Sequence, residues 1–86
     1  MGQVTLRYWA SARAAAGVEE DRIEVDGPVD LAWLVARAGE GRAELARILA
    51  SCSVLLGDRP VASADPASVR VAPGDIVEFL PPFAGG

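Results

Sequence analysis

Hydrophobic and polar residues alternate with a period of two in several short stretches of this chain. Such alternation is typical of β-strands that bury one face. The stretches are residues 4–9, 22–25, 69–71 and 75–80. A compact apolar run at residues 53–56 ends at Gly57 and also predicts a strand, and residues 60–61 are expected to return as a short edge strand.

Helical periodicity replaces this alternation in the middle of the chain. Asp30 precedes apolar residues at positions i, i+3, i+4 and i+7, the pattern of an amphipathic helix with an acidic N-cap. The alanine-rich residues 10–16 predict a shorter helix that ends in a glycine cap at Gly17, and residues 43–50 predict another helix.

The order of these elements predicts an α+β fold. Two strands that can form a hairpin are followed by helices and then by further strands, so a small mixed sheet with one main helix packed across it is expected. A β-grasp arrangement is the simplest that fits this order. We expect one domain over residues 1–80, and Pro73 with Gly74 suits the centre of a type II turn before the last strand.

Strand parity predicts an apolar patch on the open face of the sheet. The charge of Arg7 marks the outer face of the first strand, which places Trp9 on that face. Glu78 likewise marks the outer face of the last strand, which leaves Ile76 and Leu80 near solvent. If the two strands are neighbours, these residues form a patch of the kind found at protein interfaces. The alternative is a bulge that shifts the parity and makes them core residues.

Six residues follow the last predicted strand as an extended tail, residues 81–86. They are Pro81, Pro82, Phe83, Ala84, Gly85 and Gly86. The prolines remove two backbone donors, so the tail cannot extend a β-ladder, and at about 3.1 Å per residue it would reach roughly 18 Å. The last three side chains are slim enough to thread a narrow channel. This predicts a probe that delivers the α-carboxylate of Gly86 to another protein's active site; the alternative is a frayed terminus.

Composition narrows the classes of function. The chain has 86 residues and a net charge of −4, which fits one small domain and argues against nucleic acid as a partner. It contains neither histidine nor lysine, so it offers no imidazole base and no amine nucleophile. No metal-binding spacing is present, and the single cysteine, Cys52, is expected to be buried and inert. We therefore expect a protein without an active site of its own.

The same features predict a location. One cysteine cannot form an internal disulfide, which fits a reducing compartment. The N-terminus lacks the pattern of a signal peptide, and no apolar segment approaches the length of a membrane span. We expect a cytoplasmic, soluble protein that does not bind membranes.

Three further features are expected to be structural. The acidic run at residues 19–21 is predicted to be a solvated loop, with a docking patch for a basic partner as the alternative. Arg13 is expected either to pair with that run or to support its helical turn. Trp33 has Arg37 four residues further on, which favours a covering or stacking role.

The C-terminal sequence resembles that of a known family. Residues 74–86 read Gly-Asp-Ile-Val-Glu-Phe-Leu-Pro-Pro-Phe-Ala-Gly-Gly, which is similar to the C-terminus of the MoaD-like and ThiS-like sulfur carriers and closest to the small subunit of molybdopterin synthase. In that family a Gly-Asp turn leads into a hydrophobic strand, a Pro-Pro pair and a terminal Gly-Gly. Residues 7–10, with Arg13 and Gly17, are similar to the family's first strand and following helix.

The resemblance implies a ubiquitin-like fold and a set of partners. An ATP-dependent adenylyltransferase, similar to ubiquitin-activating enzymes, would adenylate Gly86, and a persulfide donor would convert the adenylate to a thiocarboxylate. No cofactor is expected to bind the carrier itself. The large subunit of molybdopterin synthase would accept the tail and use its sulfur for molybdenum cofactor biosynthesis. The two subunits would form a heterotetrameric sulfurtransferase.

The resemblance also implies roles for individual residues. Gly85 and Ala84 would pass the channel, and Pro81, Pro82 and Phe83 would set the exit angle and anchor the tail. Trp9 and Leu80 fall where the family's hydrophobic interface positions lie. Ile76, Pro60 and Val61 are expected beside them.

Three other functions stay open at this stage. The same carrier chemistry could serve thiamine thiazole, cysteine or thiolated tRNA. A ubiquitin-like modifier attached to target lysines is a different class, and a chain without lysine could not form polymers of itself. A plain interaction module with an idle tail is the third.

Overall fold

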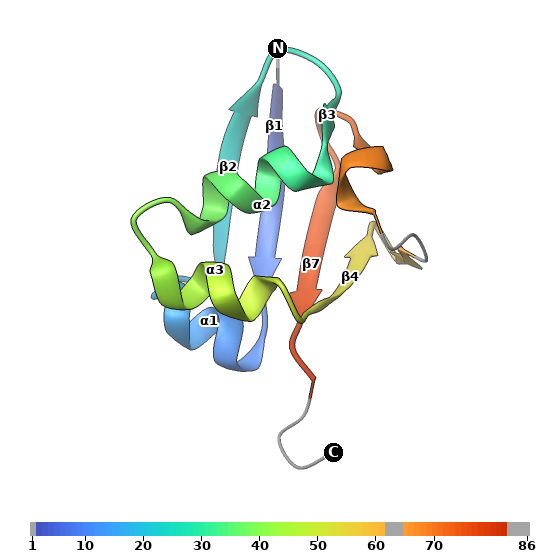
Figure 1. Ribbon diagram of the computed structural model, residues 1–86. Helices are drawn as coiled ribbons and strands as arrows, with labels where there is room; N and C mark the ends of the chain where they lie inside the picture. Colours follow the sequence, from blue (N-terminus) through green and yellow to red (C-terminus); the bar gives the residue numbers. More distant parts are fainter. Residues whose placement is uncertain (1, 62–64, 83–86) are drawn as a thin grey trace.

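A mixed β-sheet carries the helices on one face, and its other face is open (Figure 1). In this computed structural model, which describes residues 2–61 and 65–82, the sheet has five strands in the order β2-β1-β7-β4-β5, and β3 and β6 form a second sheet. The strands are β1 (Gly2–Tyr8), β2 (Glu20–Val25), β3 (Val29–Asp30), β4 (Ser53–Leu56), β5 (Arg59–Pro60), β6 (Arg70–Val71) and β7 (Ile76–Leu80).

Helices α2 and α3 cross the covered face of the sheet, and α1 lies beyond the ends of β1 and β7 (Figure 1). The helical segments are α1 (Ala10–Ala16), α2 (Leu31–Gly39), α3 (Ala43–Leu49) and the short 3-10 helix η1 (Pro66–Ser68). Gly17 ends α1 at φ 78°, and the Asp30 side chain accepts a hydrogen bond from the backbone N–H of Trp33 at 2.7 Å. Both predicted caps are therefore confirmed.

The N- and C-terminal strands are neighbours in the centre of the sheet. β1 pairs with β7 in parallel and with β2 antiparallel, which confirms the predicted hairpin with an enlarged connection that holds α1. The turn before β7 places Gly74 at φ 93° and closes with a 3.0 Å hydrogen bond from Asp75 N–H to the Ala72 carbonyl. Because β7 is the middle strand, the chain leaves the sheet from its centre and not from an edge.

The core confirms the predicted alternation of faces. In β1 the side chains of Val4, Leu6 and Tyr8 are at most 1% exposed, and in β7 Val77 and Phe79 are fully buried. The rings of Tyr8 and Phe79 stack with centroids 6.0 Å apart. The helices close this core from above with a set of apolar residues from α1, α2 and α3: Ala12, Leu31, Leu34, Ala38, Leu45 and Leu49. This parity leaves the alternate residues of β1 and β7 on the open face.

Some predicted boundaries are wrong. The acidic run is not a solvated loop, because β2 begins at Glu20 and each acidic residue contacts an arginine; Glu19, for example, lies 3.4 Å from Arg13. β1 ends at Tyr8, and Trp9 is instead the N-cap residue of α1. The strand predicted at residues 69–71 is present as β6, but its pairing with β3 was not predicted, because β3 has only two residues and lies about 40 positions away.

A half-buried polar network joins the sheet to the start of α3. The Tyr8 hydroxyl donates to Asp21 Oδ2 at 2.8 Å, and Arg42 Nη1 donates to the same oxygen at 2.8 Å. Burial of Asp21 acts to raise its pKa, but the hydrogen bonds from Arg42 and Tyr8 outweigh burial and hold the pKa below its usual value. Burial and the neighbouring Asp21 raise the pKa of Tyr8, so its hydroxyl remains a donor at neutral pH.

We expect Asp21→Asn to lower the free energy of unfolding at neutral pH by about 1.5 kcal/mol, since it removes charge-assisted hydrogen bonds to Arg42. Because the pKa of Asp21 is lowered in the folded protein, the unfolded state binds more protons, and this contribution is lost as the pH falls through that lowered pKa. When urea unfolding is measured from pH 7 to pH 2, the free energy of unfolding should therefore fall less steeply with decreasing pH in the variant than in the wild type. Glu44→Gln, which breaks only an exposed pair with Arg47, should match the wild type.

Candidate functional site

Apolar side chains gather on the open face of the sheet around the end of β7. Arg7 and Glu78 are register partners in β1 and β7, and Leu55 of β4 is the partner of Glu78 on the other side, so the three share one face. Trp9 is 44% exposed and Ile76 is 38% exposed on that face. We define the open-face patch as Trp9, Leu55, Pro60, Ile76 and Leu80. The predicted solvent-facing positions of Trp9 and Ile76 are confirmed, and their role as an interface stays a prediction.

Two hydrogen bonds hold Trp9 in place. Its backbone N–H donates to the Phe79 carbonyl at 3.2 Å, and its indole Nε1 donates to Glu78 Oε1 at 2.9 Å. The next residue, Ala10, lies at φ 49°, in a left-handed conformation that is costly for any residue but glycine. The chain turns into α1 directly after Trp9, and the indole lies beside β7 on the open face.

The other half of the open face is charged and internally paired. Glu20 lies 3.6 Å from the guanidinium of Arg7 and 3.1 Å from that of Arg22. Glu24, further along β2, accepts a hydrogen bond from the side chain of Gln3 at 2.7 Å. The open face is thus divided between a polar half over β1 and β2 and an apolar half over β7, β4 and β5.

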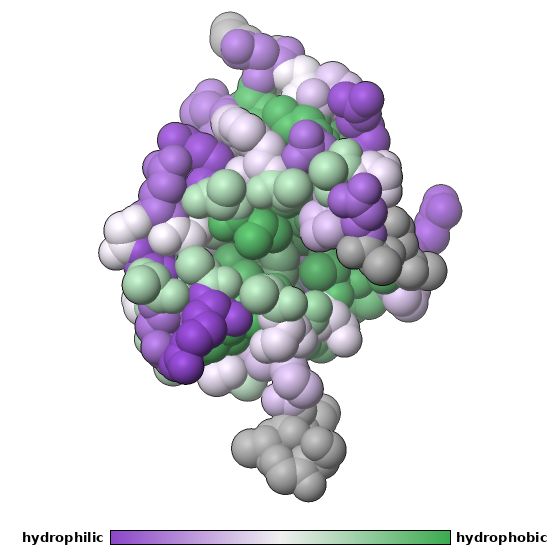
Figure 2. All heavy atoms as spheres, in the orientation of Figure 1, coloured by the Kyte–Doolittle hydropathy of each residue, from purple (hydrophilic) through white to green (hydrophobic). Residues whose placement is uncertain are grey.

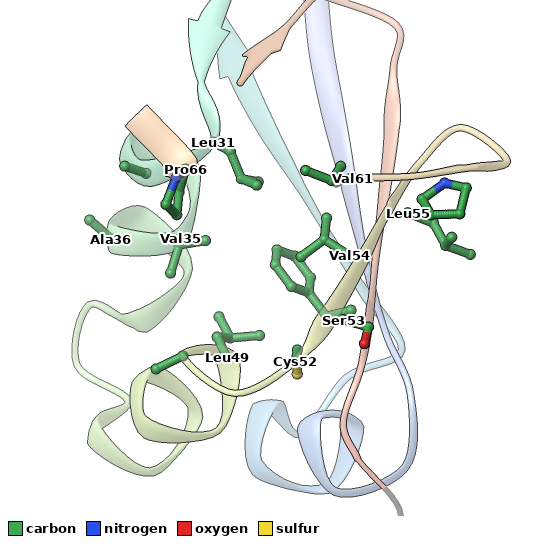
Figure 3. Close-up of a pocket in the computed structure, with 14 residues that line it drawn as sticks. Leu31, Val35, Ala36, Leu49, Cys52, Ser53, Val54, Leu55, Val61 and Pro66 are labelled. Atoms are coloured by element: carbon green, nitrogen blue, oxygen red, sulfur yellow. The ribbon is translucent and has the colours of Figure 1, made fainter. Parts of the chain in front are cut away.

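Val61 lies on the opposite side of the sheet from this patch. Figure 3 shows Val61 and Val54 pointing toward Leu31 and Val35 across a groove between β4 and α2, whereas Leu55 points away from the groove. The groove has a volume of about 840 Å³, and apolar residues gather at this hollow in Figure 2. The expectation that Val61 lies beside Trp9 and Leu80 is therefore wrong, because the side chains of successive residues in a strand point to opposite faces.

Cys52 lies at the end of this groove and is half-buried, so the prediction of full burial is only partly met. Its thiol is 3.4 Å from the Ile48 carbonyl oxygen, and burial raises its pKa to about 11. The thiol is thus protonated at neutral pH and is a weak nucleophile, in agreement with the predicted inert role.

The root of the predicted tail lies beside the open-face patch. Leu80, the last residue of β7, is the register partner of Ser53, and no further pair follows along the described strand. Pro81 is half-buried and Pro82 is exposed, and their missing N–H groups end the ladder as predicted. The remaining predicted tail residues lie outside the described part of the chain. They are Phe83, Ala84, Gly85 and Gly86.

One other predicted contact is present on α2. The guanidinium of Arg37 lies 5.7 Å from the centre of the Trp33 ring, so the predicted stacking is confirmed. Within residues 2–61 and 65–82 no group of three or more Cys, Asp or Glu side chains is arranged to hold a metal ion. In the same part of the chain no helix is both long and apolar enough to cross a membrane.

Sequence reasoning missed Leu55 as a member of the patch. The apolar run at residues 53–56 has no alternation, so its parity could be assigned only from the pairing of β4 with β7. Glu78 was used only to mark a face, although its hydrogen bond with Trp9 places it at the edge of the patch. A signal for that role was present, since Glu78 is the one charged residue in an otherwise apolar strand.

Comparison with known proteins gives one family and a set of similar folds. Residues 6–86 match the ThiS family. A search of curated protein sequences finds no match. A chain from the complex of subunits 1 and 2 of the molybdopterin-converting factor of Helicobacter pylori is 25% identical, with a TM-score of 0.67, and the alignment covers 98% of this chain and 99% of that chain.

Two archaeal structures share the fold at lower identity. A Pyrococcus furiosus protein assigned as subunit 1 of a molybdopterin converting factor is 20% identical, with a TM-score of 0.77 over 96% of this chain and 100% of that chain. SAMP1 of Haloferax volcanii is 22% identical, with a TM-score of 0.79 over 99% of this chain and 100% of that chain. The predicted α+β, ubiquitin-like β-grasp fold is therefore confirmed.

Proposed function

Since this chain belongs to the ThiS family, we propose that it carries sulfur as a thiocarboxylate on its terminal glycine, Gly86, and donates it within molybdopterin synthase for molybdenum cofactor biosynthesis. The small carriers of this family are not catalytic by themselves. The family comprises carriers and modifiers of ThiS and MoaD type.

The observation that carries the proposal is the position of the tail root. β7 is the middle strand, and it ends at Leu80 with two prolines directly after it. The chain therefore leaves the ladder at Pro81 and Pro82, at a point bordered by Trp9 and Leu80. A partner that receives the tail must also cover these apolar side chains, which couples recognition of the domain to delivery of the terminus.

The chemistry requires a free terminal carboxylate. A carboxylate is a poor electrophile, so one of its oxygens attacks the α-phosphorus of ATP on the adenylyltransferase and pyrophosphate leaves. Sulfur from a persulfide donor then attacks the acyl carbon and AMP leaves, which gives an acyl disulfide with the donor. A thiol then attacks the donor's sulfur and breaks the S–S bond, which releases the thiocarboxylate and leaves the donor and the thiol joined as a disulfide. Binding energy from the folded domain positions the acyl group for both attacks.

Two observations favour the molybdopterin branch. The segment Pro81-Pro82-Phe83 before Ala-Gly-Gly resembles the tail of the molybdopterin synthase small subunit. The Helicobacter pylori chain with 25% identity belongs to a complex of subunits 1 and 2 of the molybdopterin-converting factor. The corresponding partner of this chain would be the large subunit of the synthase from the same organism.

Intact-mass spectrometry tests the carrier function directly. Incubation of the chain with the adenylyltransferase of its own organism, ATP and a persulfide donor should raise its mass by the difference between one sulfur and one oxygen atom. Omission of ATP should leave the mass unchanged. A modifier would instead appear as an adduct on lysines of other proteins, and an unchanged mass with complete reagents would contradict sulfur carriage.

The pathway is tested by the acceptor. The thiocarboxylate form, mixed with the synthase large subunit and the molybdopterin precursor, should lose its sulfur and return to the carboxylate mass. Retention of the sulfur with this acceptor, and its release to a thiamine, cysteine or tRNA thiolation system, would overturn the molybdopterin assignment but keep the carrier function.

A further inference from the structure

Ala10 has an unusual backbone conformation at the junction of β1 and α1. Within residues 2–61 and 65–82 it is the only residue other than glycine with a positive φ, at 49°. In this left-handed region the Cβ of an L-residue lies too close to the backbone, which is costly. Such a conformation persists only where the surrounding contacts determine it, and positions of this kind are often functional.

The contacts of Trp9 determine the first side of this turn. Trp9 is extended, with φ −122° and ψ 153°, and its backbone N–H donates to the Phe79 carbonyl of β7 at 3.2 Å. The carbonyl of Trp9 accepts the N–H groups of Ala12 at 3.0 Å and Arg13 at 3.3 Å in the first turn of α1. A single residue therefore ends the contact of β1 with β7 and begins the helix, so the whole change of direction falls on Ala10.

Helix α1 fixes the other side of the turn. The side chain of Ala12 is fully buried, and the N–H of Gly17 closes the helix on the Arg13 carbonyl at 3.0 Å. Because the strand and the helix are both packed in place, Ala10 cannot change to a negative φ unless Trp9 or α1 moves.

The hydrogen bond from Trp9 to Phe79 lies at the root of the tail. Tyr8 and Phe79 are the last register partners of β1 and β7, and the Trp9 N–H extends this contact by one further bond. Pro81 follows two residues after Phe79 and begins the tail. If Trp9 moved away, the end of β7 would keep its partner on β4 but would lose its last contact with the chain of β1.

We propose that Ala10 is a positioning residue for the adenylation of Gly86, since its left-handed backbone holds Trp9 on β7 and thereby fixes the point at which the tail leaves the sheet. This inference rests on the proposed function, in which the carboxylate of Gly86 must reach the α-phosphorus of ATP. Ala10 acts through Trp9 and Phe79 and not by contact with the reacting atoms. A shift of the tail root moves the carboxylate with it, and a displacement of about 1 Å lowers the rate about 100-fold when reacting groups must be aligned.

Ala10→Val and Ala10→Gly form a matched pair of variants. Valine strongly disfavours a positive φ because its Cβ is branched, so the turn should open and kcat for adenylation at saturating carrier should fall about 100-fold. Glycine adopts the same φ without steric cost and should keep kcat within about twofold of the wild type. Equal kcat values for the two variants would overturn the proposal.

Val25→Ala separates positioning from a general loss of stability. Val25 is 5% exposed and is the register partner of Gly2, at the opposite end of β1 from Trp9. Its truncation should weaken the core and leave the tail root in place. Urea unfolding should show a lower stability for both Val25→Ala and Ala10→Val, but only Ala10→Val should lose kcat. A similar loss of kcat in Val25→Ala would show that Ala10 acts through stability alone, and would overturn the proposal.

Amide hydrogen exchange of Trp9 reports the geometry without the partner enzyme. In the wild type its backbone N–H should exchange as slowly as that of Tyr8, which donates to the Glu19 carbonyl at 2.9 Å. Ala10→Val should raise the exchange rate of the Trp9 N–H by about tenfold or more, and Ala10→Gly should leave it unchanged. Fast exchange at Trp9 in the wild type, or unchanged exchange in folded Ala10→Val, would overturn the proposal. The wild-type measurement decides the question even if Ala10→Val does not fold.

Trp9→Phe distinguishes the backbone of Trp9 from its side chain. Phenylalanine retains the backbone N–H that bonds to Phe79 but lacks the indole N–H that donates to Glu78. If the backbone carries the effect of Ala10, this variant should keep kcat within about twofold of the wild type, whatever its effect on KM. A fall in kcat as large as that of Ala10→Val would assign the positioning to the indole and overturn the backbone route.

The readouts keep the two proposals apart. Normal adenylation of the wild type with equal kcat values for Ala10→Val and Ala10→Gly would overturn the positioning role alone. A failure of the wild type to be adenylated would overturn both proposals, whatever the exchange rate at Trp9.

Discussion

Deletion of Gly86 is expected to abolish thiocarboxylate formation and to leave the fold intact. The shortened chain ends at Gly85, so its carboxylate falls about 3 Å short of the position that the domain contacts prescribe. A displacement of even 1 Å costs about 100-fold in rate when reacting groups must be aligned, so the loss should exceed that factor. Intact mass after incubation with adenylyltransferase, ATP and a persulfide donor measures this directly.

The fold has little reason to respond to this deletion. The last strand ends at Leu80, and the core residues of β7, Val77 and Phe79, precede the tail. We expect the free energy of unfolding to change by less than about 0.5 kcal/mol.

Two point variants refine the test. Gly86→Ala retains the carboxylate but adds a methyl group at the reacting residue, and it should also fail to accept sulfur if the channel admits only glycine. Ala84→Gly, a change of similar size two positions earlier, should retain sulfur loading. Full loading of the chain that lacks Gly86 would refute the role of the tail.

Trp9→Asp and Leu80→Asp are expected to weaken the complex with the synthase large subunit by about 30-fold or more. Each places a charge where apolar contact is proposed, and residues of this kind at the centre of an interface commonly cost 2 kcal/mol or more when altered. Trp9 is 44% exposed and Leu80 is half-buried, so the isolated domain should still fold. Calorimetry with the purified large subunit gives the affinity.

Trp33→Asp provides the matched control for this prediction. Trp33 is 41% exposed, close to the value for Trp9, but it lies in α2, which crosses the covered face of the sheet, on the side opposite to the patch (Figure 1). Its substitution should leave the affinity within about twofold of the wild type. If Trp9→Asp and Leu80→Asp bind as well as Trp33→Asp does, the patch is not the interface.

Local patterns predicted the elements well because their causes are local. The glycine cap at Gly17 and the acidic cap at Asp30 depend on residues within one turn of helix. The buried faces of β1 and β7 followed from alternation that the charges of Arg7 and Glu78 made unambiguous. Where these charges were missing, as in the apolar run of β4, no face could be assigned.

Pairings between distant segments were beyond the reach of these patterns. The partner of β3 lies about 40 residues away in β6, and the ion pair of Asp21 with Arg42 joins a strand to a later helix. Val61 was predicted to lie near Trp9 because its neighbour Pro60 was. The side chains of successive residues point to opposite faces, so Val61 lies on the other side of the sheet. The acidic run was assigned to a loop because three successive acidic residues show no alternation, whereas the pairing of β2 with β1 places Glu20 and Asp21 in a strand.

Local patterns in the sequence were sufficient for the small α+β domain, the caps at Gly17 and Asp30, and the buried faces of the first and last strands. The central position of β7, and the placement of Leu55 and Pro60 on the same face as Trp9, Ile76 and Leu80, became known only from the folded structure. The physical reason is that side-chain direction repeats along a strand and can be read locally. Strand order depends instead on contacts between segments that are far apart in the chain, and no local sequence pattern encodes these contacts.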